Sequence, residues 1–143
     1  DSEVWKKEHD RLKRKFRKAL ELDPLPTLER DKQSKIGFIS YGSTHFATEE
    51  ACDLLLENGI DVDYLRIRSI PLQKTVELFL KQHKRLYVVE ANRDGQMAQI
   101  LMLNFPKMAG KIRKLACGDG LGLTAKWIVD NFSNEERGHG CYA

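Results

Sequence analysis

The chain has 143 residues, of which 41% are hydrophobic and 31% charged, values typical of one domain that buries its own core. No apolar run approaches the roughly 20 residues of a membrane-spanning helix, and no signal peptide opens the sequence, so we expect neither a membrane protein nor a secreted one. The three cysteines, Cys52, Cys117 and Cys141, form no CxxC pair, which excludes the common zinc and iron–sulfur spacings and favours reduced thiols in the cytoplasm.

The first predicted element is an amphipathic helix from Val4 to Leu22. Apolar side chains at a spacing near 3.6 residues form one stripe along it: Trp5, Leu12, Phe16, Ala19 and Leu20. Basic residues crowd the stretch from Arg11 to Lys18, although the net charge of the whole chain is only +3. Such a run can bind nucleic acid or an acidic surface. Because an apolar stripe accompanies it, we favour a helix that is solvated or faces another subunit, and we expect no nucleic acid partner.

Two prolines, Pro24 and Pro26, end this helix, since proline lacks the backbone N–H that the helical ladder needs. Residues 23–34 then have the pattern of an extended linker. The predicted organisation is therefore a charged helix and linker over residues 1–34, an α/β domain over residues 35–132, and a polar, glycine-bearing tail over residues 133–143.

After Lys35, short apolar runs alternate with helical stretches. The predicted strands are Lys35–Tyr41, Asp61–Ile67, Arg85–Glu90 and Lys111–Ala116. The predicted helices are Phe46–Asn58, Lys74–His83, Gly95–Asn104 and Ala125–Phe132. This alternation indicates an α/β fold with a mainly parallel sheet and helices on both faces. The first and third strands carry near-continuous apolar runs, so we expect them to be central neighbours in a strand order of 2-1-3-4.

A glycine turn, Tyr41-Gly42-Ser43-Thr44, leaves the first of these strands and enters a helix, where backbone N–H groups can hold an anion. The sequence has neither the GxGxxG motif nor a P-loop, so a dinucleotide or nucleotide phosphate lacks its usual ligands. We therefore favour a tight turn in which Ser43 or Thr44 caps the following helix. The alternative is a freestanding anion- or nucleotide-binding α/β module that uses this turn.

A second glycine-rich segment, Gly118-Asp119-Gly120-Leu121-Gly122, begins like the thiamine diphosphate motif, in which an aspartate and a later pair of asparagines hold the bridging metal ion. Too few residues follow Gly120 for that motif, and no asparagine pair is among them. We interpret the segment as a loop that Thr124 caps into the last helix. We expect this chain to bind no thiamine diphosphate by itself.

The histidines are dispersed, at His9, His45, His83 and His139, and no HxxxH or HxxE spacing brings two metal ligands together. We therefore expect no metal site in this chain. His45, beside the start of a predicted helix, is the only histidine near a predicted crevice, and we interpret it as structural or solvent-facing.

Five segments stand in the order and spacing of a known family. They are Tyr41-Gly-Ser-Thr-His45, Gly59-Ile-Asp-Val-Asp-Tyr-Leu-Arg66, Pro71-Leu72, Val88-Val-Glu-Ala-Asn-Arg-Asp-Gly-Gln-Met97 and Asp119-Gly-Leu-Gly-Leu-Thr-Ala125. The set resembles the C-terminal region of the α subunit of 2-oxoacid:ferredoxin (acceptor) oxidoreductases, the 2-oxoglutarate and pyruvate family. The resemblance covers most of the chain. Gly95 and Gly122 depart from it, since alanine and proline are expected there.

The resemblance implies a three-layer α/β/α sandwich like the transketolase C-terminal domain, with an antiparallel edge strand for which Thr27 to Glu29 is the candidate. It also implies a cytoplasmic parent enzyme that oxidatively decarboxylates a 2-oxoacid with coenzyme A to an acyl-CoA. Thiamine diphosphate, Mg²⁺ and iron–sulfur clusters belong to other parts of that enzyme, so this chain is expected to hold no catalytic, cofactor-binding or metal-binding residue and to be inactive alone. The expected partners are the other domains of the α subunit, the β subunit and, through the complex, ferredoxin.

The predicted strand order places two loops, Gly42–His45 and Asn92–Gln96, at the carboxyl ends of neighbouring strands, where open parallel sheets bind ligands and partners. The candidate residues offer hydroxyl, amide and cationic groups beside a helix N-terminus: Ser43, Thr44, His45, Asn92, Arg93 and Gln96. We expect this edge to dock on another domain of the parent enzyme. The structural alternative is that Asn92 and Gln96 close their loop on itself.

Overall fold

The computed structural model describes residues 1–138, so His139, Cys141 and the end of the predicted tail lie outside the described residues. The strands are β1 (Thr27–Arg30), β2 (Ile36–Tyr41), β3 (Asp63–Ile67), β4 (Arg85–Glu90) and β5 (Ile112–Ala116). The helices are α1 (Ser2–Leu20), α2 (His45–Glu57), α3 (Lys74–Gln82), α4 (Gln96–Asn104) and α5 (Ala125–Glu136), with 3-10 turns η1 (Gly42–Thr44) and η2 (Pro106–Lys111). Each strand and helix predicted after Lys35 is present near its predicted bounds.

The strands form one sheet in the order β1-β3-β2-β4-β5. Strands β3, β2, β4 and β5 run parallel, so the predicted order 2-1-3-4 holds for the parallel strands. The complete order differs by one strand, because β1 is added at the edge and pairs antiparallel with β3. This is the edge strand that the resemblance implies. It lies within the segment that the proline pattern marks as a linker.

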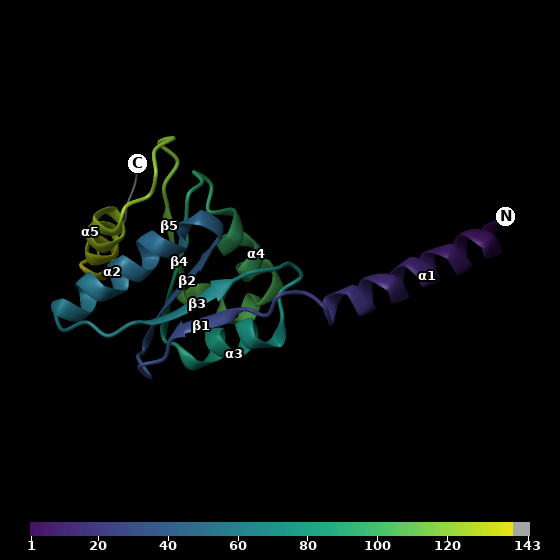
Figure 1. Ribbon diagram of the computed structural model, residues 1–143, viewed down its shortest axis with the longest axis horizontal. Helices are drawn as coiled ribbons and strands as arrows, with labels where there is room; N and C mark the ends of the chain where they lie inside the picture. Colours follow the sequence, from purple (N-terminus) through teal and green to yellow (C-terminus); the bar gives the residue numbers. More distant parts are fainter. Residues whose placement is uncertain (139–143) are drawn as a thin grey trace.

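Helices cover both faces of the sheet, which gives the predicted three-layer α/β/α sandwich (Figure 1). On one face α2 and α5 pack over a cluster that includes Phe38, Tyr87 and Phe132, whose rings meet edge to face. On the other face α3 and α4 cover Ile39 and Val88. Alternate residues of β2 therefore enter opposite layers, and this strand is buried on both sides, as its continuous apolar run indicates.

Side-chain caps at the helix starts agree only in part with the sequence prediction. Thr124 caps α5 as expected, because its hydroxyl oxygen accepts a hydrogen bond from the backbone N–H of Trp127 at 3.2 Å. The cap predicted for α2 is wrong. The chain makes the 3-10 turn η1 before this helix, and the hydroxyl of Thr44 donates to the carbonyl oxygen of Tyr41 at 2.7 Å instead.

Helix α1 projects away from the α/β domain (Figure 1). Asp1 caps its N-terminus by accepting the N–H of Glu3 at 3.1 Å. The predicted apolar stripe is exposed at the large side chains for which burial is described: Trp5 is 72%, Phe16 71% and Leu12 43% exposed. Among the described residues, none of the helices combines the length and the apolar composition needed to cross a membrane.

Candidate functional site

A buried carboxyl group lies at the carboxyl end of β4, on the predicted edge. Glu90 is fully buried and accepts two backbone hydrogen bonds from the first turn of α4, from the N–H of Met97 at 2.7 Å and of Ala98 at 2.9 Å. The first N–H groups of a helix have no partner within the helix, and the helix dipole favours a negative charge beside them. The carboxyl group of Glu90, which belongs to this same chain, thus occupies the N-terminus of α4.

Asn92 joins the two predicted loops to Glu90. Its amide nitrogen donates to Glu90 Oε2 at 2.8 Å and to the hydroxyl of Tyr41, at the end of β2, at 3.0 Å. Its amide oxygen accepts the backbone N–H of Gly95 at 2.8 Å and of Gln96 at 3.2 Å. Burial, and then the neighbouring Glu90, raise the pKa of the Tyr41 hydroxyl. Asn92 therefore closes its own loop, while docking of this edge on another domain stays a prediction.

Three of the other predicted residues lie on the surface. Ser43, Arg93 and Gln96 are exposed, and Arg93 pairs with its sequence neighbour Asp94 at 3.0 Å. Within residues 1–138 the side chains of Ser43 and Gln96 form no hydrogen bond, so their polar groups are available to a partner. Thr44 is different, because it is buried and its hydroxyl is already bonded to the backbone.

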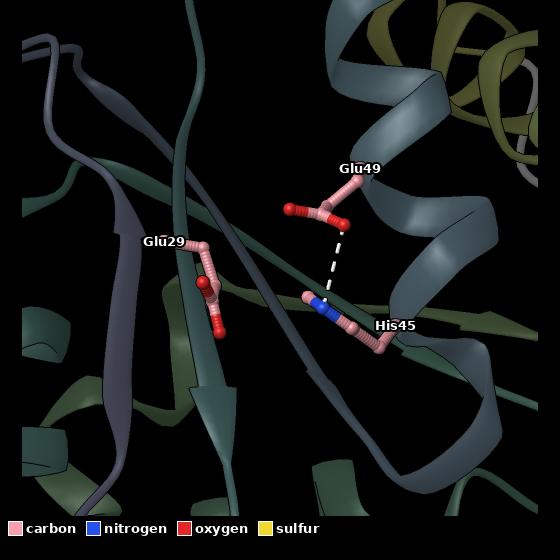
Figure 2. A group of neighbouring side chains, drawn as sticks. All are labelled: Glu29, His45 and Glu49. Carbon is pink, nitrogen blue, oxygen red and sulfur yellow. Dashed lines mark ion pairs between the residues drawn. The ribbon is translucent and has the colours of Figure 1, made fainter.

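His45, the sixth candidate, forms no hydrogen bond with Glu90 or Asn92, and its side chain lies between β3 and α2. It is buried, with Nδ1 3.0 Å from the hydroxyl of Tyr64 on β3 and Nε2 3.3 Å from a carboxylate oxygen of Glu49, one turn along α2. Glu29 of β1 lies beside these two side chains (Figure 2). The pair His45 and Glu49 has an HxxxE spacing, which the HxxxH and HxxE patterns do not include, although residues four apart also share one helix face.

A pocket of about 530 Å³ opens beside the predicted edge, lined by the ends of β2 and β3 and by the start of α4. Arg66 and Arg68 line it together with Gly42 and Met97. Neither guanidinium forms a hydrogen bond or an ion pair within residues 1–138. No prediction from the sequence included this pocket. Its signal is the Arg-x-Arg pair at the carboxyl end of a predicted parallel strand, the end that meets ligands in such sheets.

The segment Gly118–Gly122 has a packing role. A Cβ atom at Gly118 would lie 2.7 Å from the Cα of Arg93, so only glycine lets these two loops approach so closely. Asp119 accepts the N–H of Leu121 at 2.9 Å, which forms a turn, and Thr124 then begins α5. The described contacts thus agree with the interpretation of this segment as a loop.

No family model and no curated protein matches the sequence. Solved structures that share its fold include a ferredoxin oxidoreductase and two transketolases. A 2-oxoglutarate:ferredoxin oxidoreductase from Magnetococcus marinus, with 2-oxoglutarate, coenzyme A and succinyl-CoA bound, is 22% identical, with a TM-score of 0.66 and a match covering 82% of this chain and 20% of that chain. A split-gene transketolase, an inactive β4 tetramer, is 16% identical, with a TM-score of 0.63 and coverages of 74% and 39%. A mutant transketolase from Pichia stipitis is 12% identical, with a TM-score of 0.52 and coverages of 77% and 17%.

At these identities the comparisons show the fold. The chain is an α/β domain of the kind found in transketolases and in a 2-oxoglutarate:ferredoxin oxidoreductase, and its architecture is consistent with a transketolase C-terminal-like domain. The resemblance inferred from the sequence is confirmed at this level. The chain spans only 20% of the length of the 2-oxoglutarate enzyme that it matches. Activity, substrates and partners of a whole enzyme are therefore matters for proposal.

Proposed function

We propose that this chain is the non-catalytic C-terminal domain of the α subunit of a thiamine-diphosphate-dependent 2-oxoacid:ferredoxin oxidoreductase. In this role it supports the oxidative decarboxylation of a 2-oxoacid to an acyl-CoA. One agreement carries the proposal: the ordered segments from Tyr41 to Ala125 resemble this family, and the fold that they adopt is shared with a 2-oxoglutarate:ferredoxin oxidoreductase over 82% of the chain.

The chemistry of the edge supports a structural role. The carboxyl group of Glu90 is fully occupied by the start of α4 and by its own loop. The exposed groups, Ser43, Arg93 and Gln96, are of the polar and cationic kinds found at the rims of protein interfaces. Under this proposal they contact another domain of the α subunit or the β subunit. Those other parts of the enzyme hold thiamine diphosphate, Mg²⁺ and the iron–sulfur clusters. Coenzyme A is the co-substrate, ferredoxin accepts the electrons, and the enzyme is cytoplasmic.

The test uses the full-length protein that contains this chain, purified with the subunits that co-elute with it. Reduction of a viologen dye is measured with pyruvate and with 2-oxoglutarate, each with and without coenzyme A. We expect dye reduction that depends on coenzyme A and one 2-oxoacid, and its loss when residues 35–138 are deleted. The 143-residue chain alone is expected to be inactive and to give no calorimetric signal with thiamine diphosphate and Mg²⁺. Micromolar binding of that cofactor by the chain alone contradicts the proposal, as does a cofactor-loaded complex inactive on both acids.

A second candidate, a freestanding anion- or nucleotide-binding module, is favoured by the pocket that Arg66 and Arg68 line. Two guanidinium groups without a carboxylate partner are suited to phosphate, which arginine binds through paired N–H groups. The test is a thermal shift of the chain with inorganic phosphate, ATP and coenzyme A, repeated on the Arg66→Gln, Arg68→Gln double variant. A ligand-dependent rise in melting temperature that the double variant loses supports this candidate. No rise with any of the three ligands eliminates it.

A further inference from the structure

Three potential metal ligands from two elements converge outside the edge described above. Glu29 lies on β1, and His45 and Glu49 lie on the first turns of α2 (Figure 2). One ligand atom from each residue lies within 4.8 Å of the other two. His45 is buried, and both glutamates are partly buried. The proposed function uses none of the three, so it does not account for their convergence.

The backbone directs all three side chains into one place. His45 and Glu49 are four residues apart in a helix, which puts both on the same face. In β1, the pairing with β3 shifts register between Leu28 and Arg30, so that Glu29 is the extra residue of a β-bulge. Bulges change the direction of side chains. Here Arg30 also reaches α2, where its guanidinium lies 3.5 Å from the carbonyl oxygen of Glu49.

The imidazole of His45 is held from behind in the way that metal-ligating histidines are held. Its Nδ1 lies 3.0 Å from the hydroxyl of Tyr64, which in turn lies 2.5 Å from the hydroxyl of Ser40. All three residues are buried, so the protein itself, and not solvent, supplies the hydrogen-bond partners of this chain of side chains. Because hydroxyl groups both donate and accept, the network permits the tautomer in which Nδ1 donates to Tyr64. In that tautomer the lone pair of Nε2 faces Glu49.

Charge and distance both favour a cation between these groups. Glu29 forms no hydrogen bond or ion pair within residues 1–138, and it faces a second carboxylate, that of Glu49, which a bound cation would stabilise. The guanidinium of Arg30 attracts Glu49 as well, but it is paired with Asp53. With bonds of about 2.1 Å, the donor atoms of a tetrahedral zinc site lie about 3.4 Å apart. Nε2 of His45 and Oε2 of Glu49 are already 3.3 Å apart. A rotation of the Glu29 side chain brings in the third ligand.

We propose that Glu29, His45 and Glu49 bind a divalent transition-metal ion, with Zn²⁺ as the ion that best matches one imidazole and two carboxylates. Three protein ligands leave one coordination position for water or for a group from a partner. The ion joins the edge strand β1 to α2. The proposal departs from the expectation from sequence that the chain has no metal site.

The probe is ZnCl₂, added to the full 143-residue chain after treatment with a chelator. The background carries Cys117→Ser, His139→Asn and Cys141→Ser, so that these side chains cannot bind the ion. We expect one Zn²⁺ per chain by calorimetry and a rise in melting temperature of about 8 °C at a hundredfold excess over Kd. CoCl₂ is expected to compete for the same site and to give the visible absorption bands of cobalt with nitrogen and oxygen ligands.

Three variants remove one ligand each. His45→Asn is expected to abolish binding and to stay folded, because the asparagine amide replaces Nδ1 as the partner of Tyr64. Glu29→Gln and Glu49→Gln are each expected to weaken binding roughly tenfold or more. Glu50→Gln is the matched control, since Glu50 is exposed on the same helix and outside the cluster, and its affinity should equal that of the parent.

Two results would overturn the proposal. One is the absence of binding by the folded parent chain up to about 1 mM Zn²⁺, where even a weak specific site is detected. The other is binding that His45→Asn leaves unchanged, which would place the ion elsewhere. Circular dichroism of each variant separates loss of a ligand from loss of the fold. Nitrogen NMR of labelled histidine adds a direct readout, because zinc should change the His45 Nε2 signal and not that of His83.

Discussion

Nε2 of His83 lies 2.9 Å from Oδ2 of Asp63, and both side chains are buried at the amino end of β3. Nδ1 of His83 lies 2.6 Å from the carbonyl oxygen of Phe79, so each ring nitrogen lies within hydrogen-bond distance of an oxygen atom. Asp63 also accepts the backbone N–H of Lys32 at 2.6 Å and of Ser34 at 3.2 Å. The pair thus links the end of α3 to β3 and to the segment between β1 and β2.

Replacing His83 by alanine is expected to destabilise the domain strongly. The change leaves the buried Asp63 side chain with its two backbone N–H donors and without the imidazole, and the loss of one partner of a buried carboxyl group costs about 3 kcal/mol in the free energy of unfolding. The melting temperature should fall by about 10 °C, measured by circular dichroism at neutral pH. Lys84→Ala, at the neighbouring exposed position, should leave it unchanged. A loss below about 1 kcal/mol would mean that the pair adds no more than an ordinary hydrogen bond.

Glu90→Gln is expected to weaken the start of α4. A glutamine has one acceptor oxygen, whereas the two carboxylate oxygens of Glu90 accept the N–H groups of Met97 and Ala98 separately. One buried N–H then lacks its acceptor, which costs about 2 kcal/mol. Urea unfolding measures this loss, and Glu50→Gln on the surface of α2 serves as the control. Equal stability of the two variants would show that Glu90 does not stabilise this helix.

The thiol of Cys52 should resist alkylation in the folded chain. It is 1% exposed, and burial raises its pKa from an ordinary 9.0 to about 12, so very little thiolate forms at pH 8.5. Iodoacetamide at that pH should leave Cys52 unmodified in the native chain and modify it in guanidinium chloride, as peptide mass spectrometry can show. This thiol favours the folded state fully below about pH 9, and the contribution is lost as pH rises toward 12. Fast native-state labelling of Cys52 would contradict its burial.

The parts of the fold that could be predicted are those where one local signal dominates. β2 and β4 are buried on two faces and carry continuous apolar runs, so their central position follows from the pattern. β1 has only four residues, Thr27–Arg30, and its place depends on pairing with the distant β3. No periodicity shows such a pairing, and only the resemblance to a family indicated this strand.

The candidate site was harder to predict, because its geometry depends on turns and on contacts between distant residues. Ser43 and His45 are close in sequence, but the 3-10 turn η1 leaves one exposed and buries the other against β3. From the sequence, Glu90 is expected only as the last residue of a strand. Its bonds reach Met97 and Ala98, seven and eight positions ahead, and no local pattern reveals a side chain that caps a helix from that distance.

Different residues of the edge are expected to affect the stability of the domain and its docking on another domain. Asn92 forms hydrogen bonds with Glu90, Tyr41 and its own loop, so Asn92→Ala should lower the stability of the isolated domain by about 1–2 kcal/mol. Ser43 and Gln96 are exposed and without side-chain hydrogen bonds in residues 1–138. The double variant Ser43→Ala, Gln96→Ala should therefore leave the melting temperature unchanged.

If this edge docks on another domain of the parent enzyme, that double variant should nevertheless weaken assembly of the full-length complex, because polar groups that bond across an interface are lost. Size-exclusion chromatography of the complex over a dilution series measures this effect. Glu50→Gln, exposed on α2 and away from this edge, is the control and should dissociate like the parent. The opposite outcome has two parts: the double variant assembles normally, and Asn92→Ala assembles less well only in proportion to its lost stability. That outcome would show that the loop is structural and that the parent enzyme docks elsewhere.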